Sequence, residues 1–166
     1  MNVLVSIILV ASSFPGFVSL DPPKVKSRDL QILMGAQWIG TLTYLDYSRN
    51  KPVSIPSKLT VTQSKGDKLS WVFEYQYPDE PKANSEETVT ISKDGKTIGG
   101  ETVVERTKLA GNTLRIVTEK NGMDDNKKSL FRHTYLINAN NFSIRKEVRF
   151  EGTAEFFERN QYSWRR

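Results

Sequence analysis

The chain has 166 residues, 24 Lys and Arg against 19 Asp and Glu, and no cysteine. This length favours a single domain with a hydrophobic core of its own. The lack of cysteine excludes disulfides, thiolate metal sites and cysteine nucleophiles. Basic and acidic residues alternate without a run of five or more Lys or Arg, so no nucleic-acid-binding patch is indicated.

The first segment has the composition of a signal peptide. Residues Met1–Leu20 carry no charged side chain, and the apolar run Val3–Ala11 is too short to span a bilayer. Small residues follow it and offer cleavage positions. We therefore predict a cleaved signal peptide over residues 1–20, a secreted or periplasmic location, and no membrane span in the mature chain. The alternatives are a buried N-terminal strand or an uncleaved anchor.

Residues 21–35 are predicted to form an extended lead and a short helix. The Asp21-Pro22-Pro23 segment favours an extended backbone. Ser27 can cap a helix, and Gly35 is a natural C-terminal stop. Apolar residues lie at helical spacing between them, namely Leu30, Leu33 and Met34. A helix of about two turns is unstable alone, so we expect it to dock on an apolar surface.

From residue 36 to residue 166 the hydrophobic period is two, which indicates strands. The clearest strand places Leu69, Trp71, Phe73, Tyr75 and Tyr77 on one face. The Asp94-Gly95 pair is a strong hairpin signal. The predicted strands are Gln37–Tyr47, Val53–Gln63, Lys68–Tyr77, Glu86–Ser92, Lys96–Lys108, Thr113–Glu119, Lys128–Ile137, Phe142–Glu151 and Ala154–Trp164.

Short links between these strands leave no room for crossover helices, which excludes a parallel sheet. The sequence therefore predicts an all-β domain, a single antiparallel up-and-down β-barrel of about nine to ten strands. Barrel closure needs bends, and Gly99-Gly100 is a candidate for one. The alternative is a β-sandwich. A barrel that spans a membrane is not expected, because the second faces of the strands are polar.

The search for catalytic chemistry finds one candidate. His133 is the only histidine, and it shares a strand face with Phe131, Tyr135 and Ile137. It is either a general base or metal ligand, or a hydrogen-bonded core residue. No nucleophile elbow, phosphate-binding loop or zinc-ligand spacing occurs. We therefore assign no catalytic residue, no metal ligand and no cofactor, and no pattern indicates an oligomeric state.

Aromatic residues on the inward strand faces point to a binding function. In a small barrel such residues either fill the lumen or line a cavity for one small ligand. Tyr and Trp offer apolar walls with polar tips, which suits an amphipathic ligand. The candidate ligand-binding residues are Tyr44, Trp71, Phe73, Tyr75, His133, Tyr135 and Tyr162.

Arginines in the middle of strands are a second feature. An inward arginine could grip a ligand carboxylate in a bidentate contact, whereas outward arginines would form cross-strand ion pairs. The residues concerned are Arg106, Arg132, Arg145, Arg149 and Arg159.

The layout resembles the lipocalin-like, or calycin, barrels. The features that carry this resemblance are the signal segment, the short helix, and Gly35-Ala36-Gln37-Trp38 opening the first strand. In lipocalins a Gly-x-Trp motif opens that strand and its Trp packs under an arginine from the end of the barrel. The resemblance implies that Trp38 pairs with Arg165, or with Arg159, to close the barrel. Here the spacing is Gly-x-x-Trp.

The chain also looks like small exported bacterial proteins with the same layout, for which the resemblance implies no activity. The lipocalin resemblance implies binding of a small hydrophobic or amphipathic molecule in the lumen. Two other functions stay open: an enzyme on a barrel scaffold that uses His133, and a structural or interaction module with a filled core.

Overall fold

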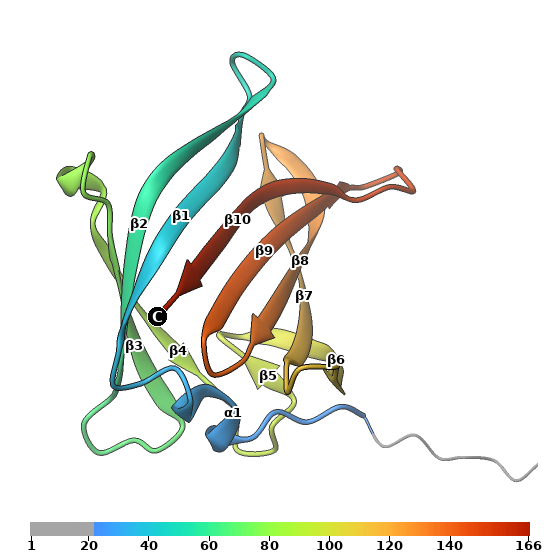
Figure 1. The fold of residues 1–166 in the computed structure, drawn as a ribbon. Coiled ribbons are helices and arrows are strands. Elements are labelled where there is room, and N and C mark those ends of the chain that lie inside the picture. The colour runs from blue at the N-terminus through green and yellow to red at the C-terminus, as the bar shows by residue number, and fades with distance from the viewer. Residues whose placement is uncertain (1–21) are drawn as a thin grey trace, which may run out of the picture.

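The computed structural model describes residues 22–166 and shows an all-β domain with one short α-helix (Figure 1). The predicted signal peptide, residues 1–20, lies outside the described residues. One sheet holds all ten strands. The elements are α1 (Ser27–Gln31), β1 (Gln37–Asp46), β2 (Lys51–Gln63), β3 (Ser70–Gln76), the 3-10 helix η1 (Pro81–Ala83), β4 (Ser85–Thr90), β5 (Thr97–Ile98), β6 (Glu101–Lys108), β7 (Leu114–Asp124), β8 (Lys127–Ile137), β9 (Asn141–Phe150) and β10 (Phe157–Arg165).

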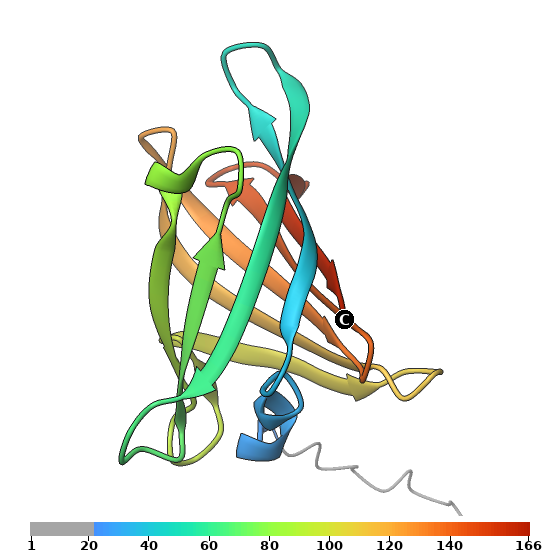
Figure 2. The ribbon, with the colours of Figure 1, turned by 60° about the vertical axis from the view of Figure 1, so that its left-hand side comes forward.

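The sheet curls into a nearly closed barrel, which confirms the predicted fold class and discards the sandwich. Its order is β4-β3-β2-β1-β10-β9-β8-β7-β6-β5, with every pair antiparallel. The two end strands of this order, β4 and β5, are neighbours in the chain. A bridge between Ile91 and Ile98 joins them. Figure 2 shows how β6, in yellow, runs across the lower part of the barrel.

Closure between β4 and β5 is short and leaves a seam in the barrel wall. The Gly99 amide donates to the Thr90 carbonyl at 2.9 Å, and the Ser92 amide donates to the Thr97 carbonyl at 3.1 Å. Gly99 and Gly100 both have positive φ, 56° and 77°, so the chain bends sharply between β5 and β6. This bend divides the predicted strand Lys96–Lys108 in two and turns β6 away from β4.

The stretch between the predicted strands Thr113–Glu119 and Lys128–Ile137 is largely strand. β7 continues to Asp124, and β8 begins at Lys127. Only Asp125 and Asn126 form the turn, with φ of 47° and 59°. Two consecutive residues with positive φ form a two-residue hairpin turn whose twist matches the strands beside it. The sequence prediction missed this because a polar stretch resembles a loop when its pairing partner is unknown.

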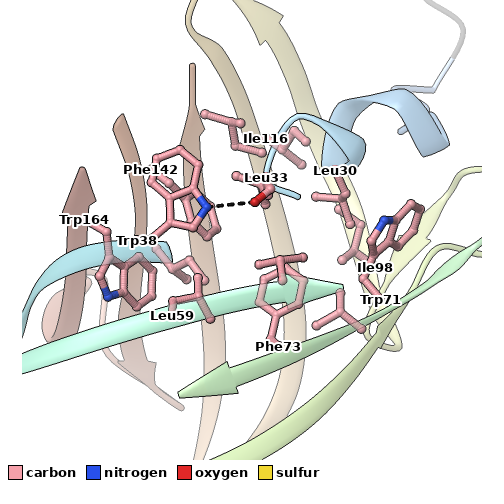
Figure 3. Close-up of a cluster of buried hydrophobic side chains, with 14 of the residues drawn as sticks. Leu30, Leu33, Trp38, Leu59, Trp71, Phe73, Ile98, Ile116, Phe142 and Trp164 are labelled. Carbon is pink, nitrogen blue, oxygen red and sulfur yellow. Dashed lines mark hydrogen bonds between the residues drawn. The ribbon is translucent and has the colours of Figure 1, made fainter. Parts of the chain in front are cut away.

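The core lies at the end of the barrel that α1 covers (Figure 3). Leu30 and Leu33 from the helix segment pack among Trp38, Trp71 and Ile98, all at most 1 % exposed. The Trp38 indole Nε1 donates to the Leu33 carbonyl at 2.8 Å. The predicted docking of a helix too short to be stable alone is therefore what closes this end of the barrel.

An ion pair fixes α1 to the barrel wall. Arg106 of β6 binds Asp29 through two hydrogen bonds, Nε to Oδ2 at 2.8 Å and Nη2 to Oδ1 at 2.7 Å. The Asp29 side chain is only 5 % exposed. Its Oδ2 also accepts the Lys26 amide at 2.8 Å, as a residue in the first turn of a helix can. Arg106 was expected either to bind a ligand carboxylate or to form a cross-strand ion pair. It does neither, because it pairs with Asp29 of the helix.

Candidate functional site

A pocket of about 290 Å³ lies in the barrel lumen, on the far side of the core from α1. It is bounded by β3 and β4 on one side and by β8, β9 and β10 on the other. Five of the predicted ligand-binding residues line it, namely Phe73, Tyr75, His133, Tyr135 and Tyr162. Polar residues that the sequence prediction did not include line it as well, namely Ser85, Glu87, Glu101, Lys146 and Asn160.

The register of β8, β9 and β10 arranges one wall of the lumen in rows. Nearest the core, Ile137, Phe142 and Trp164 lie side by side on adjacent strands. The next row is Tyr135, Ile144 and Tyr162. The third row is His133, Lys146 and Asn160. The wall therefore changes from apolar to amphipathic to polar with distance from the core, as the binding site of an amphipathic ligand requires.

An imidazole and a carboxylate form the central polar contact of the pocket. His133 Nδ1 lies 2.8 Å from Glu101 Oε2, and the Thr118 hydroxyl donates to the same oxygen at 2.6 Å. Burial disfavours the Glu101 carboxylate, but hydrogen bonds from His133 and Thr118 outweigh burial and lower the pKa of Glu101. The side chains of His133 and Glu101 are 19 % and 14 % exposed. The contact with Glu101 thus orients the imidazole ring of His133. The other ring nitrogen, Nε2, has no hydrogen bond among residues 22–166.

Tyrosines supply the amphipathic surface of the pocket. The rings of Tyr75 and Tyr162 lie 5.4 Å apart, and the hydroxyls of Tyr77 and Tyr162 share a hydrogen bond of 2.6 Å. Burial raises the pKa of Tyr75, Tyr135 and Tyr162 far above the usual range. All three phenols therefore stay protonated at physiological pH and can donate hydrogen bonds to a ligand.

Two charged residues of the pocket have no polar partner within the part of the chain that the structure describes. Glu87 on β4 and Lys146 on β9 form neither a hydrogen bond nor an ion pair there. Burial raises the pKa of the Glu87 carboxyl, although the residue remains accessible to solvent. Burial also lowers the pKa of the Lys146 ammonium, which lies 4.0 Å from the centre of the Phe131 ring.

The sequence held a signal for these charged residues. Lys146 alternates with Phe142, Ile144 and Val148, so it is the one charged residue on an apolar strand face. Glu87 likewise shares its face with the buried Val89. A charge on an apolar face is costly unless it is paired or functional. Applied to each strand in turn, that rule would have selected both residues.

Two predicted ligand-binding residues do not line this pocket. Trp71 is fully buried in the core beside α1, so it supports the barrel end instead of the lumen wall. Tyr44 is half-buried, with its Cα opposite Asn160 on β10, and lies outside the set of residues that line the pocket.

The residue over Trp38 is Arg166. Its guanidinium lies 4.8 Å from the centre of a Trp38 ring. The lipocalin resemblance implied Arg165 or Arg159 at this position, but Arg165 lies opposite Ile39, whose 56 % exposure marks the outer face of the sheet. Side chains alternate along a strand, so the next residue returns to the inner side. Arg159, the other candidate, lies over Tyr47 and donates to the Leu45 carbonyl at 2.7 Å.

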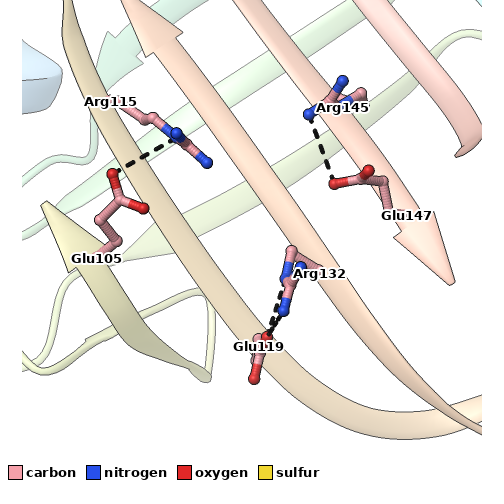
Figure 4. Close-up of polar contacts among 6 residues, drawn as sticks. All are labelled: Glu105, Arg115, Glu119, Arg132, Arg145 and Glu147. Carbon is pink, nitrogen blue, oxygen red and sulfur yellow. Dashed lines mark hydrogen bonds and ion pairs between the residues drawn. The ribbon is translucent and has the colours of Figure 1, made fainter. Parts of the chain in front are cut away.

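Three other mid-strand arginines pair with glutamates on the outer face (Figure 4). Arg132 binds Glu119 at 2.6 Å, across β7 and β8. The other two pairs have nitrogen–oxygen distances of 3.5 Å and 3.6 Å, and they are Arg115–Glu105 and Arg145–Glu147. The predicted arginines Arg132 and Arg145 thus point outward and do not line the lumen pocket, but only Arg132 forms the expected cross-strand pair, because Arg145 and Glu147 both lie on β9.

A larger hollow of about 510 Å³ lies where β7 ends, β8 begins and β9 ends. Its residues come from neighbouring positions of paired strands, such as Ser129 and Phe150, so it is a depression along one sheet. Its lining contains polar residues such as Lys128, Arg149 and Glu151, but none of the predicted ligand-binding residues. The lumen pocket is therefore the stronger candidate site.

No helix within residues 22–166 has the length and apolar character needed to cross a membrane. The same residues contain no group of three or more His, Cys, Asp or Glu side chains placed to hold a metal ion. Comparison with protein-family models found no match. Comparison with curated proteins likewise found no match.

Proposed function

We propose that this protein is a lipocalin-like binding protein that holds a small amphipathic ligand in its barrel lumen. The observation that carries the proposal is the lumen pocket, whose wall grades from Ile144 through Tyr135 and Tyr162 to His133 and Lys146. Its volume of about 290 Å³ lies at the lower end of ligand-binding sites, so the ligand is small. The contact between Arg166 and Trp38 supports the lipocalin-like assignment.

The first test is native mass spectrometry of protein purified from its source, followed by displacement of a fluorescent fatty acid. We expect a bound small molecule and a saturable displacement signal. Absence of both would contradict the proposal.

A matched pair of variants locates the binding. Ile144 points into the lumen and Ser143, the preceding residue, points to the outer face. Ile144→Trp should fill the pocket and abolish displacement, whereas Ser143→Trp should leave it within about twofold of the native value. Far-ultraviolet circular dichroism checks that both variants keep the sheet. Equal binding by both variants would place the ligand outside the lumen.

We also propose that residues 1–20 are a signal peptide and that the mature protein is secreted or periplasmic. The apolar run Val3–Ala11 supports this. Mass spectrometry of the mature N-terminus should show cleavage after residue 13 or later, as the small residues there predict. A mature chain that still begins with Met1 would contradict it.

A second candidate function is catalysis by His133. The observation that favours it is the hydrogen bond between His133 Nδ1 and Glu101, because a carboxylate that orients an imidazole is a common way to build a general base. Once a substrate is found by activity screening, His133→Gln should lower kcat by about 100-fold or more. Unchanged kcat would exclude this function.

A further inference from the structure

Opposite charges face the lumen pocket from opposite walls. Glu87 lies on β4 and Lys146 on β9, five places apart in the order of a ten-stranded barrel. Strands at that separation stand across the lumen from each other. Both residues line the same pocket, and neither has an ion pair within 4.0 Å among residues 22–166. The pocket is therefore lined by one carboxylate and one ammonium that have no ion-pair partner within these residues.

The other charged groups of the lumen are already paired. Glu101 accepts hydrogen bonds from both His133 and Thr118. Farther toward the open end, Arg159 lies 3.7 Å from Asp124. Glu87 and Lys146 are thus the charged groups of the pocket that have no ion-pair partner within residues 22–166, although Lys146 also contacts the Phe131 ring and Glu87 is exposed to solvent. Burial raises the pKa of Glu87 and lowers the pKa of Lys146, which agrees with the lack of an ion-pair partner for either group.

Aromatic side chains line the same pocket as the two charges. Tyr75 is 8 % exposed and Phe73 is 1 % exposed, and both reach the pocket from β3. Tyr135 and Tyr162 reach it from β8 and β10. A ligand in the pocket therefore meets aromatic surface as well as the two charges.

We propose that the ligand of the lumen is a small zwitterion with an apolar or aromatic body, such as a free amino acid, whose ammonium binds Glu87 and whose carboxylate binds Lys146. This inference rests on the proposed binding function and specifies its ligand class. Asn160 lies beside Lys146 on β10 and can donate its amide to the same carboxylate. A ligand with only one charge would satisfy one wall and leave the other charge unpaired.

Three probes with one phenyl body separate the charges. L-Phenylalanine carries both, 2-phenylethylamine carries only the ammonium, and 3-phenylpropionate carries only the carboxylate. Isothermal titration of the mature protein near pH 7 should give the tightest binding for L-phenylalanine, by about tenfold over either single-charge probe. A single-charge probe that binds as tightly as L-phenylalanine would overturn the inference, while still supporting binding in the lumen.

Variants assign each charge to its wall. Glu87→Gln should weaken the binding of L-phenylalanine by about tenfold and leave the affinity for 3-phenylpropionate within about twofold. Lys146→Met should also weaken the binding of L-phenylalanine by about tenfold, but leave the affinity for 2-phenylethylamine within about twofold. The matched control is Glu86→Gln, since Glu86 is the exposed neighbour on the outer face of β4. Equal losses in Glu86→Gln and Glu87→Gln would overturn the inference. Urea unfolding of each variant checks that it is folded.

The failure of this inference differs from the failure of the proposed function. If L-phenylalanine does not bind but the fluorescent fatty acid does, the zwitterion is overturned and the binding function stands. If neither binds, both are overturned.

Discussion

At the scale of single residues, two buried tryptophans differ in one hydrogen bond. Trp38 and Trp71 are both fully buried. Trp38 Nε1 donates to Leu33, whereas Trp71 Nε1 has no partner within the described part of the chain. Exchange to phenylalanine leaves a cavity at either site. At position 38 it also leaves the Leu33 carbonyl unpaired, and at position 71 it removes a donor that was already unpaired.

Trp38→Phe should therefore lower the free energy of unfolding by about 1 to 3 kcal/mol more than Trp71→Phe does. Urea unfolding followed by circular dichroism measures both, and the remaining tryptophans serve as fluorescence reporters. A larger loss in Trp71→Phe would contradict the assigned hydrogen bond.

Two carboxyls of the lumen should respond to acid in opposite ways. The pKa of Glu101 is lowered from its ordinary 4.5 by the folded state, so its stabilisation is complete above pH 4.5 and is lost as the pH falls through the folded-state value. The pKa of Glu87 is raised from the same ordinary value, so ionisation of its carboxyl opposes folding as the pH rises above 4.5.

Glu101→Gln should therefore lower stability at pH 7 by roughly 1 kcal/mol and weaken the acid dependence of unfolding. Glu87→Gln should raise stability at pH 7 by less than about 1 kcal/mol, since its side chain is partly solvated. Urea midpoints measured from about pH 3 to pH 7 test both signs. Changes of the same sign in the two variants would contradict the assignment.

At the scale of elements, α1 depends on the barrel wall. A helix of five residues has no stability alone, and the buried pair Asp29–Arg106 fixes it beside Leu30 and Leu33. Removal of one partner of a buried ion pair leaves the other charge uncompensated. An outer-face pair, Arg132–Glu119, offers the comparison, because its side chains are 36 % and 23 % exposed.

Asp29→Ala should lower the free energy of unfolding by about 3 kcal/mol, and Glu119→Ala by less than about 1 kcal/mol. Limited proteolysis should also cut Asp29→Ala first near α1. Equal losses in the two variants, or an unchanged proteolysis pattern, would show that packing alone holds the helix.

At the scale of the whole molecule, the seam between β4 and β5 is where the barrel is weakest. The Ile91 amide donates to Leu69, toward β3, so by alternation the Val89 amide points to β3 and the Thr88 amide points to the seam. The pocket reaches this seam through Ser85, Glu87 and Gly99. A ligand could therefore pass between the strands without unfolding of the sheet.

Native-state hydrogen exchange should show the Thr88 amide exchanging roughly 100-fold faster than the Val89 amide. Saturation with a ligand that occupies the lumen should slow exchange along β4 more than along β1. Equal protection of the two amides would mean that the seam is closed in solution.

The alternation of apolar and polar residues determined the barrel and much of the lumen wall. Five of the predicted ligand-binding residues line the pocket because strand periodicity fixes the face of each side chain. In the structure Arg132 points outward and His133 inward, as alternation requires, but the sequence alone left the direction of Arg132 open. Periodicity is local, so one sequence suffices to read it.

The tertiary structure alone decided which residues meet. Asp29 and Arg106 are 77 positions apart, and Glu101 and His133 are 32 apart. Such contacts depend on the order and register of strands and on the bend at Gly99 and Gly100, which turns β6 across the barrel end. Local periodicity carries no information on these distances. The sequence therefore determined which side of the sheet each residue occupies, and closure of the barrel decided its partner across the lumen.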